Sequence, residues 1–204
     1  MIKELIPLTN NKMEILKIIY EKEETHLLNI AKELKLHPYS AQKTLAKLKF
    51  ILKEKKAGRT IILSIDKTKP KYFELVKMIE DYRLTTKNKI VNSIIKNLSN
   101  LFSDKNILTC VLFGSYARLS FTKDSDVDIL LVIKKRGAEI KNKVSQLSAV
   151  LGKEVNPLIL SEKEFMLAIT KKEPSIMSLK IPTQRLIIKE ADYFLKMINN
   201  YEIT

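Results

Sequence analysis

Gly114 and Ser115 follow an apolar run, residues 107–113, and are placed to begin a phosphate-binding turn. Glycine permits a tight turn and a close approach of the backbone. The N–H groups at the start of a short helix would attract phosphate, and Arg118, one turn further on, could reach a phosphate oxygen. We therefore predict a nucleotide-binding role for Gly114, Ser115 and Arg118, although a Gly-Ser pair alone is common by chance.

Two aspartates, the first separated from Ser115 by ten residues, are candidates for binding a metal ion. Asp126 and Asp128 lead into the apolar run 129–133, which is typical of a strand. Alternate strand residues point to one face, so the carboxylates would project together with Cα atoms roughly 6.5–7 Å apart. Such carboxylates repel each other, and a hard divalent cation relieves the repulsion. The alternative is a polar loop with capping residues. That alternative fits Asp124 well, but it fits Asp128 poorly, because apolar residues follow Asp128 immediately.

This arrangement resembles the polymerase-β-like nucleotidyltransferase superfamily, and most closely its minimal nucleotidyltransferase branch. The resemblance covers roughly residues 86–165 and implies a small mixed sheet flanked by helices. It implies that Gly114 and Ser115 hold a triphosphate and that Asp126 and Asp128 bind Mg²⁺, with a pair of ions as the usual arrangement for in-line displacement. ATP or another nucleoside triphosphate would be the substrate.

The superfamily also implies a third acid on a later strand, near the attacking hydroxyl. The candidate strand covers residues 154–160, and the matching position holds Asn156. An amide is a weak metal ligand and cannot act as a base, whereas Glu154 lies two residues earlier on the same face. We therefore predict Asp126, Asp128 and Glu154 as catalytic residues. Nucleotide binding without efficient turnover stays open as an alternative.

The N-terminal part of the chain predicts three helices and a hairpin over residues 10–66. Apolar residues recur at helical spacing in residues 13–20, 27–34 and 41–48. Thr25 is the expected N-cap of the second helix. A basic, β-branched segment then follows, and its glycine suits a hairpin tip. This order of elements resembles a winged helix-turn-helix domain.

Basic residues crowd the third predicted helix and the hairpin. Residues 35–59 contain eight Lys or Arg against one acid, in a chain with a net charge of +14. Such charge favours DNA or another polyanion. The predicted DNA contacts are two polar side chains for base edges and five cations, namely Ser40, Gln42, Lys43, Lys47, Lys55, Lys56 and Arg59. The alternative is a dimerisation or protein-docking module with a solvated basic face.

The composition argues against several other classes of protein. Cys110 is the only cysteine and only two histidines occur, so neither a disulfide nor a Cys/His zinc site is expected. Four scattered glycines do not suit a Rossmann or Walker A loop. The N-terminus does not resemble a signal peptide, and no apolar run reaches the length of about 18 residues that spans a membrane. We therefore expect a cytoplasmic protein without membrane contact.

These observations predict an α/β protein with two domains. A winged helix-turn-helix domain covers residues 1–66, a linker and helix cover 67–85, and a nucleotidyltransferase domain covers 86–204. The predicted function is Mg²⁺-dependent transfer of AMP from ATP to a hydroxyl acceptor, with DNA bound by the winged helix. Because some minimal nucleotidyltransferases act as antitoxins, the resemblance also implies a protein acceptor such as a toxin, and a homodimer is compatible with it. The alternative is a DNA-binding transcriptional regulator with a weakly active or inactive nucleotidyltransferase domain.

Overall fold

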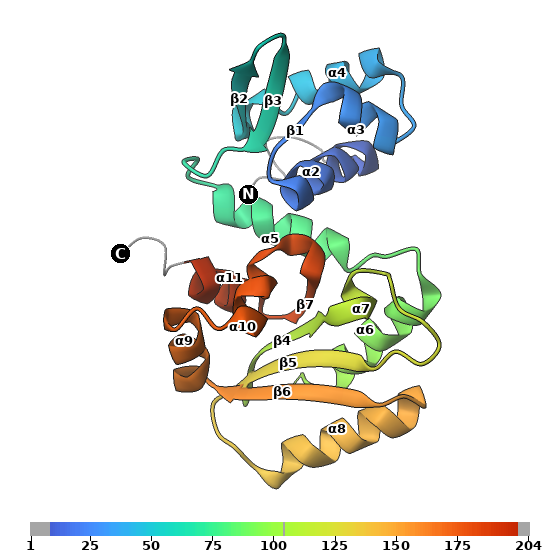
Figure 1. Ribbon diagram of the computed structural model, residues 1–204, viewed down its shortest axis with the longest axis vertical. Helices are drawn as coiled ribbons and strands as arrows, with labels where there is room; N and C mark the ends of the chain where they lie inside the picture. Colours follow the sequence, from blue (N-terminus) through green and yellow to red (C-terminus); the bar gives the residue numbers. More distant parts are fainter. Residues whose placement is uncertain (1–8, 104, 200–204) are drawn as a thin grey trace. The chain divides into compact units, whose positions relative to one another are not determined.

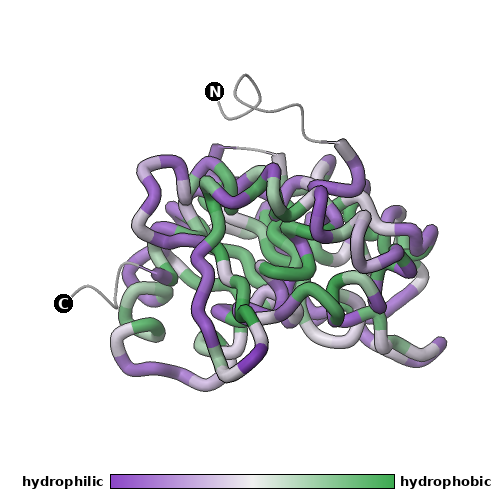
Figure 2. Tube along the Cα trace, turned by 90° about the horizontal axis from the view of Figure 1, so that it is seen from above, coloured by the Kyte–Doolittle hydropathy of each residue, from purple (hydrophilic) through white to green (hydrophobic). Residues whose placement is uncertain are grey.

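The computed structural model describes residues 9–103 and 105–199, and the chain divides into two compact units between Tyr82 and Arg83. Each unit has its own sheet and its own apolar core (Figure 1). Apolar stretches of the trace gather inside while polar turns face outward (Figure 2). No helix in the described part of the chain combines the length and the apolar character needed to cross a bilayer.

The first unit consists of helices and a three-stranded antiparallel sheet in the order β1-β3-β2. Its elements are α2 (Asn10–Lys22), β1 (Thr25–His26), α3 (Leu27–Glu33), α4 (Pro38–Ala46), the 3-10 helix η1 (Lys49–Ile51), β2 (Leu52–Ala57), β3 (Thr60–Ile65) and α5 (Tyr72–Arg83), whose last residue begins the second unit. Gly58 has a φ of 60° at the hairpin tip, a conformation that glycine adopts without strain. The predicted helices and hairpin are present, and their assignment as a winged helix-turn-helix stays a prediction.

Helix α5 packs into the core of the first unit through Leu75 and Ile79. Two hydrogen bonds from tyrosine hydroxyls hold α5 against α2: Tyr82 donates to Glu14 Oε1 (2.8 Å) and Tyr20 donates to Glu80 Oε1 (2.6 Å). The later part of the segment predicted as linker and helix, residues 67–85, is therefore a packed element of this unit.

The N-cap of α3 differs from the prediction. Thr25 lies in β1, where it pairs with Leu63 of β3, and its hydroxyl accepts a hydrogen bond from Asn29 Nδ2 (2.9 Å). The helix is capped one residue later, because His26 Nδ1 accepts a hydrogen bond from the Asn29 N–H (3.3 Å). The sequence pattern located the helix start, but strand pairing took Thr25 out of the cap position.

The second unit is a mixed four-stranded sheet with helices on both faces (Figure 1). Its elements are α6 (Lys89–Leu101), β4 (Ile107–Phe113), α7 (Gly114–Ala117), β5 (Val127–Ile133), α8 (Ala138–Leu151), β6 (Val155–Ser161), α9 (Glu162–Thr170), α10 (Pro174–Met177), η2 (Ser178–Lys180), η3 (Pro182–Gln184), β7 (Arg185–Lys189) and α11 (Ala191–Asn199). The strand order is β6-β5-β4-β7, with β5 and β6 parallel and the other pairs antiparallel. The predicted small mixed sheet flanked by helices is confirmed.

The two faces of β5 have different surroundings. Val127, Ile129 and Leu131 join the core that includes α6 and α8. The alternate residues face the other side of the sheet, where α9 contacts β5 and β6 and α11 contacts β4 (Figure 1). On that side Leu130 is buried, Asp128 is half-buried and Asp126, just before the strand, is exposed. Asp126 and Asp128 thus lie at the edge of the part of this face that α9 and α11 cover.

Helix α9 begins with a capping box. Ser161 Oγ accepts a hydrogen bond from the Glu164 N–H (3.3 Å), and the Glu164 carboxylate accepts one from the Ser161 N–H (2.7 Å). Arg136 also pairs with Glu164 (2.8 Å). Together these contacts lower the pKa of Glu164 to about 2, with the Ser161 N–H as the largest cause.

Candidate active site

Gly114 joins the end of β4 to the acids at the start of β5. Its φ is 70°, which disfavours any residue with a side chain. A Cβ atom at this position would lie 3.0 Å from Asp128 Cγ and closer still to Oδ2. The backbone turn therefore touches the carboxylate directly, because Phe113 and Asp128 are paired across β4 and β5. Both constraints require glycine at this position.

The two aspartates interact as close like charges. Burial raises the pKa of Asp128, and the charge of Asp126 raises it further. A hydrogen bond from Asn156 and the positive charge of Arg118 partly oppose this rise. Carboxylate oxygens that repel each other suit a hard divalent cation, so the donor set fits Mg²⁺.

Asn156 occupies the position opposite Asp128 on the parallel strand β6. Its Nδ2 donates a hydrogen bond to Asp126 Oδ2 (3.2 Å). Asn156 therefore places a neutral donor beside the two acids. We call Gly114, Asp126, Asp128 and Asn156 the acid site.

Glu154 lies just before β6 and is exposed. Its carbonyl accepts a hydrogen bond from the Val127 N–H (2.9 Å), which places it beside Asp126 in the continuing register. Strand alternation puts Glu154 on the same face as Asn156. Within residues 9–103 and 105–199, however, its carboxylate bonds neither aspartate, and no three acidic, His or Cys side chains form a cluster suited to a metal ion. Its predicted catalytic role stays a prediction.

Arg118 stands at the end of the turn and near the acids. It is exposed, and its Nη1 donates a hydrogen bond to Gln184 Oε1 (3.2 Å) in η3. Ser115, in α7, is partly exposed beside Gly114. The sequence did not indicate Gln184, because no motif surrounds it and its contact with Arg118 joins residues 66 positions apart.

The loop that leads to Asp126 is held by Tyr116, a second residue that sequence reasoning missed. Tyr116 is fully buried, stacks on Phe121 with ring centroids 4.4 Å apart and donates a hydrogen bond to the Ser125 carbonyl (3.2 Å). Lys153 Nζ, from beyond α8, donates to the Lys123 carbonyl (2.8 Å). The only sequence signal for this support was the aromatic residue directly after Gly114-Ser115.

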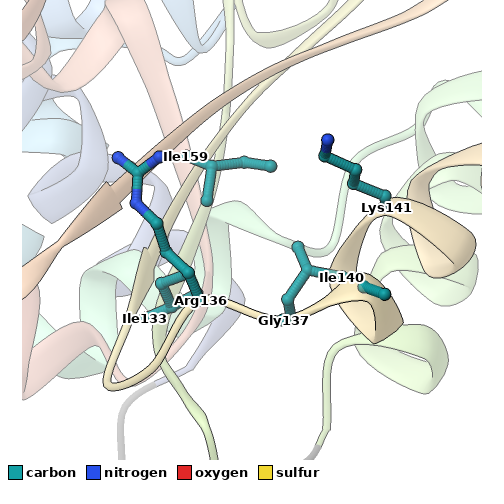
Figure 3. A pocket seen from close by; sticks show the side chains of 7 residues that line it. Ile133, Arg136, Gly137, Ile140, Lys141 and Ile159 are labelled. Atoms are coloured by element: carbon teal, nitrogen blue, oxygen red, sulfur yellow. The ribbon is translucent and has the colours of Figure 1, made fainter.

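A groove of about 480 Å³ lies at the other end of β5, away from the acid site. Its floor is apolar and its rim carries two cations; the lining residues are Ile133, Arg136, Gly137, Ala138, Ile140, Lys141 and Ile159. The side chains of Arg136 and Lys141 lie on opposite sides of it (Figure 3). None of the predicted site residues lines this groove.

The predicted DNA contacts all lie on the surface of the first unit. Helix α4 buries Ala41 and Leu45, while Gln42 and Lys43 between them are exposed. Strand β2 is exposed from Lys53 to Ala57. The exposed set is complete: Ser40, Gln42, Lys43, Lys47, Lys55, Lys56 and Arg59. Their exposure is compatible with a polyanion partner but does not distinguish it from a solvated face.

Comparison with known families shows what the second unit is similar to. The family model described as polymerase beta, nucleotidyltransferase, matches residues 94–192, which contain the acid site. This match supports the nucleotidyltransferase superfamily that the sequence motif implied for this part of the chain.

Among curated proteins, the chain is similar to "Putative protein adenylyltransferase MJ0141" of Methanocaldococcus jannaschii. The two are 39% identical over 46 residues, which are 22% of this chain and 46% of that protein. The chain thus spans less than half the length of the curated relative that it matches.

Solved structures of low similarity include a toxin–antitoxin complex with AMP-PNP. That chain is 18% identical with a TM-score of 0.35, and the match covers 55% of this chain and 87% of that one. Another is the tri-AMPylated Shewanella oneidensis HEPN toxin in complex with MNT antitoxin, at 17% identity and a TM-score of 0.33, covering 56% and 85%. Similarity at this level carries no argument about the acceptor or the partner of this chain.

Proposed function

We propose that the second unit transfers AMP from ATP to a hydroxyl group of an acceptor. The acceptor oxygen forms a bond to the α-phosphorus, pyrophosphate leaves and the hydroxyl proton passes to a base. The observation that carries this proposal is the close approach of Gly114 to Asp128, which joins the turn proposed to bind phosphate to a pair of carboxylates. Ser115 and the N–H groups of the turn would bind the triphosphate. Arg118 would neutralise a phosphate oxygen, since it is exposed beside the acids.

Asp126 and Asp128 would hold Mg²⁺ against the nucleotide. Both offer the oxygen ligands that this ion prefers. Burial, and then the charge of Asp126, raise the pKa of Asp128, so a cation beside the pair would be favoured. When bound, the ion would supply positive charge to the reacting phosphates. The two residues orient the α-phosphate between the turn and the acceptor.

Glu154 is the candidate base for the acceptor hydroxyl. Its position beside Asp126, on the same face as Asn156, leaves an exposed carboxylate near the acids. Asn156 cannot take this role, because its amide has no basic site and donates to Asp126. Turnover in this chain would therefore depend on Glu154 reaching the acceptor.

The acceptor is proposed to be a protein hydroxyl, in line with the name of the Methanocaldococcus jannaschii relative. A toxin protein is one such acceptor, which would make the chain antitoxin-like. Incubation of a co-expressed ribonuclease toxin with the protein and ATP, followed by mass spectrometry, tests this idea. A mass increase of one AMP on the toxin supports it, and an unmodified toxin contradicts it.

Label transfer from [α-³²P]ATP to a cell extract tests the activity itself. The wild type is compared with Asp126→Asn/Asp128→Asn, which keeps side-chain shape but removes both charges. Asp124→Asn is the matched control, because Asp124 is exposed in the same loop and has no proposed role. Transfer by the wild type and the control but not by the double variant supports the proposal. Equal labelling by all three proteins contradicts it.

The second candidate is a DNA-binding regulator with a weakly active nucleotidyltransferase domain. Two observations favour it: Asn156 stands at the position of the third acid, and the α4 and β2 side chains predicted to meet DNA are exposed. Such lysine contacts give affinity that falls steeply with salt. Filter binding to a duplex from the region upstream of the gene, at two salt concentrations, separates specific binding from simple charge attraction. Salt-sensitive binding with sequence preference, without label transfer, would favour the regulator.

A further inference from the structure

The side chain of Asn156 offers the acid site a hydrogen-bond donor. Asn156 is paired with Asp128 across β5 and β6, and its Nδ2 donates to Asp126 Oδ2 (3.2 Å). Ionised carboxylates only accept hydrogen bonds, so the amide presents its NH₂ group to Asp126. An NH₂ group has no free lone pair for a cation. The group that faces Asp126 from β6 is therefore a donor and not a metal ligand.

The charge balance of the site points the same way. Two divalent ions about 3.5–4 Å apart repel each other strongly, and carboxylates that bridge and flank them offset this repulsion. Asp126 and Asp128 supply two carboxylates. Across the described residues, no third acid joins the pair in a cluster suited to a metal ion. The protein therefore supplies carboxylate ligands for one cation, and a second would lack the third carboxylate and would meet the Asn156 amide.

We propose that this acid site binds one divalent cation with the nucleotide, and that the Asn156 amide takes the place of the second ion. The inference rests on the proposed nucleotide–cation function of the same site. It means that Asn156 is a positioning residue, which holds both aspartates in place for a single ion. Nucleotide is then retained more readily than it is turned over.

Counting bound Mn²⁺ by electron paramagnetic resonance tests this proposal, because the signal of free Mn²⁺ disappears on binding. The full chain is saturated with AMP-PNP and titrated with Mn²⁺, with AMP-PNP alone subtracted. We expect one tightly bound Mn²⁺ per wild-type complex, two for Asn156→Asp, which adds a third carboxylate, and one for Asn156→Ala, which removes the donor without adding a ligand.

Two tightly bound Mn²⁺ ions in the wild type would overturn the proposal, and so would a single ion in a folded Asn156→Asp variant. The wild-type count decides the question even when the extra carboxylate of Asn156→Asp prevents folding. Failure of the proposed function gives a different result, since none of the proteins would then bind Mn²⁺ in a nucleotide-dependent way. That result would overturn both proposals.

Discussion

The acid site and the basic face of the first unit both suit polyanions, but they do so by different physical means. In the acid site, Gly114, Asp128 and Asn156 are fixed by contacts on three strands or turns. On the basic face, all seven predicted DNA contacts are exposed, and none of the five predicted cations forms an ion pair within the described residues. Recognition, as proposed, would depend on geometry in the first region and on charge in the second.

This difference determines how each region should respond to mutation. A site held by close contacts loses function abruptly when one contact is changed, because its parts depend on one another. A face of independent lysines loses affinity in steps, since each charge contributes separately to the salt dependence. The following predictions separate the two modes.

Gly114→Ala should have the largest effect. The left-handed φ costs about 1–2 kcal/mol for alanine, and the collision of Cβ with the Asp128 carboxylate adds about 1–3 kcal/mol. We expect the free energy of unfolding, measured by urea denaturation, to fall by the sum of these two costs. We also expect ATP binding to be lost. Gly152→Ala is the matched control, because Gly152 has a φ of 60° and no atom within 4 Å of an added Cβ. Equal effects of the two changes would show that the acid site is not tightly fitted.

Neutralising the hairpin should weaken DNA binding in proportion to the charges removed. In Lys55→Gln/Lys56→Gln/Arg59→Gln, the slope of log affinity against log salt should fall in magnitude by about 3 if each side chain contacts one phosphate. The control Lys163→Gln/Lys171→Gln/Lys172→Gln removes the same charge from exposed positions of the second unit. If the two triple variants change filter binding equally, the DNA affinity arises from nonspecific charge and not from the basic face.

Ser40→Ala/Gln42→Ala should have a smaller and different effect. These side chains are exposed on α4 and carry no charge, so the salt slope should not change. A lost base contact costs about 1–3 kcal/mol for the preferred sequence only. Competition between a selected duplex and random DNA measures this loss. An unchanged preference would remove direct base readout from the proposal.

Contacts outside the acid site should each contribute little to stability. The contacts of Glu164 with Ser161 and Arg136 are an example. Its pKa of about 2 lies below the usual 4.5, so its stabilising contribution is complete above pH 4.5 and is lost as the pH falls toward 2. We expect Glu164→Gln to lower Tm by a few degrees at pH 7 and by progressively less between pH 4.5 and 2. Glu173→Gln, an exposed control, should not show this trend. A constant difference across the pH range would mean that the charge of Glu164 is not the cause.

Local patterns predicted the parts of the fold that depend on neighbouring residues. The strands β4 and β5, and the helices and hairpin of residues 10–66, all follow from periodicity or short spacing. The cap at His26 was missed because it depends on Thr25 pairing with β3, 38 positions away. Strand pairing over such distances leaves no local signal.

The acid site was predictable only in part for the same reason. The spacing of Gly114, Asp126 and Asp128 is local, and the structure brings Gly114 and Asp128 into contact. The hydrogen bond from Asn156 to Asp126 depends on the parallel register of β5 and β6. The crossover through α8 sets this register. The sequence showed that an acid was missing at Asn156, but it did not show that the amide would bond Asp126.

Calorimetric titration of AMP-PNP in the presence of Mg²⁺ tests the central claim most directly, namely that the acid site binds a nucleotide with a divalent cation. We predict one nucleotide bound per chain for the wild type and for Asp124→Asn. For Asp126→Asn/Asp128→Asn we predict affinity lower by at least about 100-fold, equivalent to about 2.7 kcal/mol. Nucleotide binding of equal affinity in all three proteins would contradict the claim.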